Sequence, residues 1–103
     1  MIPSSFQLMG QTLLVWVIPE KKWTDDNAVG MYLPQRCEIV IRGNLPPQSM
    51  QQAFCHELTH AILGAMGKDE LSRDEAFVDV FGSLLHQAWT TVEFGHKAQK
   101  KAK

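Results

Sequence analysis

The sequence predicts a small α+β domain in which three short strands precede two helices. Short apolar runs rich in Val, Ile and Leu occur in the first 42 residues, and segments with helical spacing of apolar residues follow from about residue 49 to residue 91. With 103 residues, of which 45% are hydrophobic and 20% charged, the chain has the size and composition of one folded domain. We expect this domain to span residues 1–92, and residues 93–103 to form a flexible Lys-rich tail.

Three segments predict the strands. Residues 13–18 (LLVWVI) form an apolar run between Gly10 and Pro19, which is typical of a buried strand. Residues 28–33 and 37–41 follow, and the three residues that separate them suggest a hairpin. We therefore expect a three-stranded sheet that ends before the first helix.

The first helix is predicted from a capping box. Residues 49–52 (SMQQ) fit this pattern, in which the Ser side chain accepts a hydrogen bond from the amide three residues later. We expect the helix to begin at about Met50 and to end near Gly64 or Gly67, because glycine readily adopts the left-handed conformation that follows many helices.

A second capping box, residues 72–75 (SRDE), predicts a second helix that runs to about Thr91. The turn before it is short, so this helix should run antiparallel to the first and pack behind it. Its larger apolar residues fall on one arc of the helix. They are Phe77, Val78, Phe81, Leu84, Leu85 and Trp89.

The pentapeptide HELTH, residues 56–60, is the most informative motif of the chain. His56 and His60 are four residues apart inside a predicted helix, so both imidazoles project from one face and can bind the same metal ion. Glu57 flanks that face, where a carboxylate can accept the proton of an attacking water molecule. These residue types at this spacing indicate a zinc hydrolase.

A catalytic zinc site requires three protein ligands, so a third must come from another segment. Glu75 and Asp79 are four residues apart in the first turns of the second helix, beside the His60 end of the motif. We predict Glu75 as the ligand and Asp79 as the group that orients one of the histidines, although the reverse assignment is possible. Glu75 could also serve only the capping box. His86 lies too far along the helix to share this metal, so we interpret it as a surface or packing residue.

Taken together, residues 56–60 and the later Glu-x-x-x-Asp of residues 75–79 resemble the gluzincin zinc peptidases. The order of elements is similar to that of the minimal gluzincins and of the small ImmA/IrrE-like and phage-encoded metallopeptidases. The resemblance covers residues 28–90. It implies Zn2+ as the cofactor, Glu57 as the catalytic residue, and a small twisted sheet packed on the active-site helix with an antiparallel helix behind it.

The same resemblance implies a peptide substrate that lies extended along a sheet edge, formed here by residues 28–33 or 37–41. Large gluzincins carry a C-terminal domain that supplies a Tyr or His to stabilise the oxyanion, and this chain shows no such domain. Tyr32 could replace that residue if its strand borders the cleft. A Tyr with no catalytic role is the alternative.

The leading hypothesis from the sequence is therefore a zinc metallopeptidase. The alternative is a zinc-bearing protein-binding or regulatory module with little catalysis. Four of the ten basic residues lie in the last seven positions, behind an acidic body, so we expect no nucleic-acid partner. We also expect no membrane association and a cytoplasmic location, because neither a spanning segment nor a leader peptide is recognisable, and reduced thiols at Cys37 and Cys55. The sequence leaves the oligomeric state open.

Overall fold

The structure of the chain is a computed structural model, which describes residues 1–97. It confirms the α+β class, with a mixed sheet of four strands and three helices rather than three strands and two helices. The elements are β1 (Ser5–Leu8), β2 (Gln11–Ile18), β3 (Gly30–Leu33), β4 (Glu38–Arg42), α1 (Pro47–Ala65), α2 (Asp69–Ser72) and α3 (Glu75–Thr91), with short 3-10 turns at Glu20–Lys22 and Pro34–Arg36. Most of the predicted Lys-rich tail, residues 98–103, lies outside the described residues.

The sheet has the strand order β1-β2-β4-β3. β3 and β4 pair antiparallel around the Pro34–Arg36 turn, which confirms the predicted hairpin. β2 and β4 run parallel, with Val15 opposite Ile39. Consequently β4 is an inner strand and β3 is an edge strand whose second side has no partner strand among residues 1–97.

The prediction of only three strands was wrong because β1 was missed. β1 pairs antiparallel with β2 through a turn in which Met9 and Gly10 have φ values of 53° and 78°. Positive φ at both central residues is typical of a two-residue hairpin turn. β1 has only four residues, all exposed or half-buried, so it lacks the apolar run that marks a strand in the sequence. Its Phe6 ring packs edge-on against Phe54 of α1, with ring centres 5.8 Å apart.

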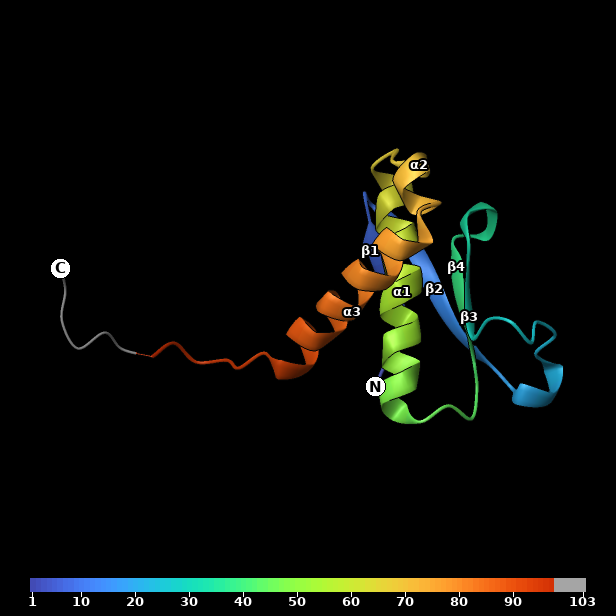
Figure 1. Cartoon of the computed structure of the whole chain (residues 1–103), viewed down its shortest axis with the longest axis horizontal. Coiled ribbons are helices and arrows are strands. Elements are labelled where there is room, and N and C mark those ends of the chain that lie inside the picture. Colours follow the sequence, from blue (N-terminus) through green and yellow to red (C-terminus); the bar gives the residue numbers. More distant parts are fainter. Residues whose placement is uncertain (98–103) are drawn as a thin grey trace.

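One face of the sheet packs on α1 (Figure 1). The core of this contact consists of Val15, Ile39 and Ile41 from the sheet and Ala53, Phe54 and Cys55 from the helix. Ile39 and Ile41 are fully buried, which fixes the position of α1 beneath the centre of the sheet. Cys37 and Cys55 are both free thiols in this structure, and burial raises the pKa of Cys55. Among the described residues, no helix is both long and apolar enough to cross a bilayer.

Both long helices begin at residues other than those predicted from the sequence. α1 begins at Pro47, two residues before Ser49, because proline at the first helical position has the required φ and lacks only an amide that would be unpaired. α3 begins after Asp74, whose carboxylate accepts a hydrogen bond of 3.1 Å from the Phe77 amide. Ser72 instead ends α2. The predicted ends are close to those observed, since α1 stops at Ala65 and α3 at Thr91.

The expected apolar arc of α3 is only partly buried. Val78 is completely buried and Gly82 also lies in the contact with α1, but the side chains of Phe81, Leu84 and Trp89 are 44%, 60% and 66% exposed. Figure 1 shows the reason, because α3 runs back beside α1 and then diverges from it toward its C-terminal end. The apolar arc therefore combines buried residues on the α1 side with exposed ones farther out.

Gly82 allows the two helices to approach closely, and this gives the first prediction. A Cβ atom at Gly82 would lie 3.2 Å from the Cα of His56, whereas one at Gly64 of α1 would lie 3.8 Å from its nearest neighbour, the Tyr32 ring. We expect Gly82→Ala to lower the free energy of unfolding by about 1–2 kcal/mol, because a backbone contact must be displaced. Gly64→Ala is the control and should raise it by about 0.5–1 kcal/mol through helix propensity. Urea denaturation measures both, and equal stabilisation by the two substitutions would contradict the close packing.

Candidate metal centre

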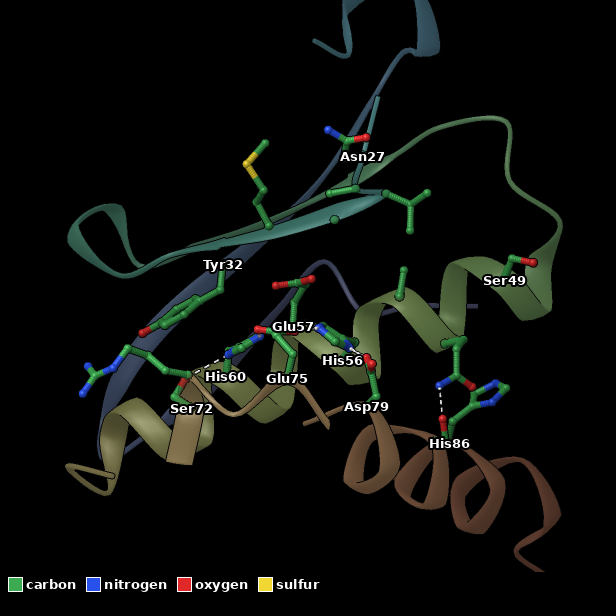
Figure 2. Close-up of a pocket in the computed structure, with 18 of the residues that line it drawn as sticks. Asn27, Tyr32, Ser49, His56, Glu57, His60, Ser72, Glu75, Asp79 and His86 are labelled. Atoms are coloured by element: carbon green, nitrogen blue, oxygen red, sulfur yellow. Dashed lines mark hydrogen bonds and ion pairs between the residues drawn. The ribbon is translucent and has the colours of Figure 1, made fainter. Parts of the chain in front are cut away.

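The histidines of the pentapeptide lie on one face of α1, as their spacing predicts. Their ring centres are 5.1 Å apart, and the side chains of His56 and His60 are 25% and 16% exposed. Both imidazoles point toward the start of α3 (Figure 2). The helix therefore presents two nitrogen donors to the same point in space.

Glu75 completes the cluster from the first turn of α3. Its Oε1 lies 3.3 Å from Nε2 of His56 and its Oε2 lies 3.3 Å from Nε2 of His60. The potential ligand atoms of these three residues all lie within 4.8 Å of one another. The structure thus brings together the three predicted ligands, and the cluster could hold a metal ion.

The opposite ring nitrogens have partners of their own. Nδ1 of His56 lies 3.0 Å from a carboxylate oxygen of Asp79, and Nδ1 of His60 lies 2.9 Å from the hydroxyl of Ser72. A hydrogen bond that holds the proton on Nδ1 leaves the lone pair of Nε2 free to bind a metal. Because Asp79 contacts the far side of the His56 ring, the geometry favours Glu75 as the third ligand and Asp79 as the orienting group.

Ser72 is the residue that sequence reasoning missed. Its position before an acidic helix start suggested a capping residue, but Asp74 has that role and the Ser72 hydroxyl contacts His60. The available signal was its place twelve residues after His60, in a turn that must return the chain to the motif. No local pattern distinguishes such a contact from a cap.

The protonation of the cluster suits a metal site. Burial is the main cause that lowers the pKa of His60. The carboxylates of Glu75 and Asp79 raise this pKa by less, and His56 lowers it further. The neutral imidazole is the form that binds metal. The cluster offers two imidazoles and one carboxylate, and Nδ1 of each imidazole has a partner of its own. This set of donors fits a divalent ion such as zinc.

Glu57 is buried next to the ligands. Only 8% of it is exposed, and Gly30 of β3 lies so close that a Cβ there would be 3.2 Å from Cγ of Glu57. Burial is the main cause that raises the pKa of Glu57 to about 7. His56 lowers this pKa, the Glu75 carboxylate raises it, and a hydrogen bond from the backbone N–H of Tyr32 lowers it. A carboxyl group with this pKa can both accept and release a proton near neutral pH.

These residues line a cleft of about 1640 Å³ between β3, the segment before it, and the three helices. Tyr32 lies in the same cleft, with its ring near Gly64, and burial raises its pKa. Figure 2 shows His86 and Ser49 at one end of the cleft and Ser72 at the other. His86 is half-buried, as a packing residue would be, and its Nε2 has no hydrogen-bond partner among the residues that the structure describes.

Comparison of the chain with family models, with curated proteins and with solved structures finds no match in any of the three. The resemblance to gluzincins therefore stays a prediction that depends on the motif residues.

The cluster predicts distinct metal contents for variants of its two acidic residues. Glu75→Ala removes a donor and should abolish stoichiometric metal binding. Asp79→Ala keeps all three donors and should weaken affinity by about 10–100-fold, because only the orientation of His56 is lost. Metal analysis after dialysis and competition with a chromogenic chelator measure both effects. Glu93→Ala, at an exposed site beyond α3, is the control, and an unchanged affinity of Glu75→Ala would exclude Glu75 as a ligand.

Proposed function

We propose that the chain is a zinc-dependent metallopeptidase in which His56, His60 and Glu75 bind the metal. The observation that supports this proposal most strongly is the buried Glu57 carboxyl group directly beside the three donors. A site that binds metal only for stability does not need a buried carboxyl group with a pKa of about 7. Burial of such a group costs stability, so its presence in the cleft favours a catalytic role.

Bound zinc would supply a Lewis acid and make water a stronger acid in this cleft. Glu57 would accept the proton of the attacking water and deliver it to the amine that leaves when the peptide bond breaks. Asp79, whose carboxylate only accepts, would keep His56 in the tautomer with a free Nε2. The Ser72 hydroxyl would do the same for His60 when it accepts the hydrogen bond from Nδ1.

The edge strand β3 offers a binding mode for the substrate. β3 borders the cleft, and its side opposite β4 has no partner strand among residues 1–97. The backbone N–H of Tyr32 already donates to Glu57, so an incoming peptide would pair with the remaining main-chain groups of this edge. An extended peptide could pair with this edge and pass over Glu57. The cleft is open at the surface, which would admit a segment of a longer polypeptide.

The zinc-bearing binding or regulatory module remains the second hypothesis, and one substitution separates the two. Glu57→Gln keeps the shape of the side chain and removes its base. We expect unchanged zinc content and a loss of about 10²–10⁴-fold in kcat for cleavage of an unfolded protein substrate. Glu20→Gln, at an exposed position outside the cleft, is the control.

The result that would contradict the catalytic assignment is cleavage by the Glu57→Gln variant at the parental rate. A parent protein that binds zinc stoichiometrically and cleaves no peptide in a broad substrate library would support the binding module instead.

Tyr32 is proposed to donate a hydrogen bond to the substrate carbonyl oxygen as that oxygen gains negative charge. Tyr32→Phe keeps the ring and removes the hydroxyl, so we expect kcat to fall about 10²-fold with little change in KM or zinc content. Steady-state kinetics on the same substrate measures this. An unchanged kcat would assign Tyr32 to the wall of the cleft alone.

A further inference from the structure

The cleft that holds the candidate metal centre contains one Lys or Arg side chain among residues 1–97, that of Arg73. The acidic residues that line the cleft are Asp26, Glu57, Asp69, Glu75 and Asp79. Glu75 and Asp79 contact the histidines of the metal centre, and Glu57 is buried beside them. An arginine stays protonated at any physiological pH, so Arg73 places one permanent positive charge in the cleft outside the metal centre.

Arg73 has no acidic partner within the described part of the chain. Four acidic residues lie within four positions of it in the sequence, and they are Asp69, Glu70, Asp74 and Glu75. Asp69 has the four-residue spacing at which opposite charges commonly pair on a helix. Nevertheless, Arg73 is in none of the ion pairs found among residues 1–97. Its side chain lines the cleft instead, where its N–H donors are available to a ligand.

The backbone at Arg73 is fixed beside the metal centre. Its amide donates to the carbonyl oxygens of Asp69 and Glu70 at 3.1 and 3.2 Å. The preceding residue, Ser72, has its hydroxyl 2.9 Å from Nδ1 of His60. Arg73 therefore follows directly on a residue that contacts a proposed metal ligand, so only its own side chain must be ordered when it binds a group in the cleft.

The edge strand β3 leads toward this end of the cleft. Gly30 lies against Glu57, and Tyr32 lies at the same end of the cleft as Ser72 (Figure 2). The strand ends at Leu33, where the Pro34–Arg36 turn begins. A peptide that pairs with β3 and has its cleaved bond at the metal centre would thus have few main-chain partners left beyond Tyr32. A side chain that binds the peptide at this end would supply the missing contact.

Building on the proposed peptidase function, we propose that Arg73 binds a carboxylate of the substrate on the Ser72 side of the metal centre. The planar guanidinium presents paired N–H donors whose spacing matches the two oxygens of a carboxylate. This carboxylate belongs either to an Asp or Glu side chain or to the C-terminus of the peptide, since both present the same two oxygens. Arg73 would then determine specificity and take no part in breaking the bond.

Cleavage of matched peptides by the zinc-loaded full chain tests the proposal and separates the two sources. One series carries Glu or Gln at successive positions on each side of the cleaved bond, and a second has a free or an amidated C-terminus. We expect kcat/KM to be about 5–20-fold higher for the carboxylate member of one pair, with a smaller ratio at high salt. A ratio in the first series assigns a side-chain carboxylate, and a ratio in the second assigns the C-terminus.

Substitutions at Arg73 connect this preference to the residue. Arg73→Gln should reduce the ratio to about one, and Arg73→Glu should favour a Lys peptide over the Glu peptide, both with unchanged zinc content. Arg36→Gln is the matched control, because Arg36 is 73% exposed and does not line the cleft. Equal rates for every pair of peptides with the parent, or a preference that persists in Arg73→Gln, would overturn the proposal.

A binding measurement distinguishes failure of this proposal from failure of the peptidase assignment. The same peptides, labelled with fluorescein at the N-terminus, are titrated with the zinc-loaded Glu57→Gln variant and followed by fluorescence anisotropy. We expect tighter binding of the carboxylate peptide, and loss of this difference when Arg73→Gln is added. If the parent cleaves no peptide but the binding difference is present, the peptidase assignment fails and Arg73 keeps its role. Cleavage without any carboxylate preference, or binding without one, overturns the role of Arg73 alone.

Discussion

The close approach of α3 to α1 at Gly82 is the contact on which the candidate site depends. The absence of a side chain at Gly82 lets α3 lie against the backbone of Cys55 and His56. Asp79 and Glu75 precede Gly82 by about one and two helical turns, so they lie on the same face and meet the histidines of α1. The position of Glu75, the proposed third ligand, is therefore set by the packing of α3 on α1.

A second close approach determines the environment of Glu57, the proposed general base. Gly30 of β3 has no side chain at the point where the edge strand passes over Glu57, and a Cβ there would lie 3.1 Å from Cδ1 of Ile41 as well as against Glu57. The carboxyl group is enclosed between strand and helix, and this burial is the main cause of its raised pKa. Two glycines in different elements thus make room, Gly82 for the approach of α3 to α1 and Gly30 for the Glu57 carboxyl group.

The sequence predicts the site better than it predicts the sheet, for a physical reason. Helical spacing places His56 and His60 on one face whatever surrounds them, and four-residue spacing does the same for Glu75 and Asp79. The structure confirms that His56, His60 and Glu75 come together in a cluster that could hold a metal.

What the sequence does not contain is the tertiary context. β1 forms only because β2 is available as a partner and Phe6 packs on Phe54, and neither contact leaves a local pattern. The contact between Ser72 and His60 is also tertiary, because the sequence around Ser72 fits a helix cap as well as it fits this contact. The capping-box pattern also predicted too late a start for α1. Pro47 is the first residue of this helix, and Ser49 is its third.

The reversed polarity of α3 links the metal site to the surface of the molecule. A helix that supplies carboxylates to a cleft must turn its polar side inward, and the outer side is then free to be polar or apolar. In this chain the outer side is apolar, and Val80 and Leu84 are each 60% exposed. α3 also diverges from α1, and Leu85 still packs against the core while Leu84 and Trp89 are largely exposed.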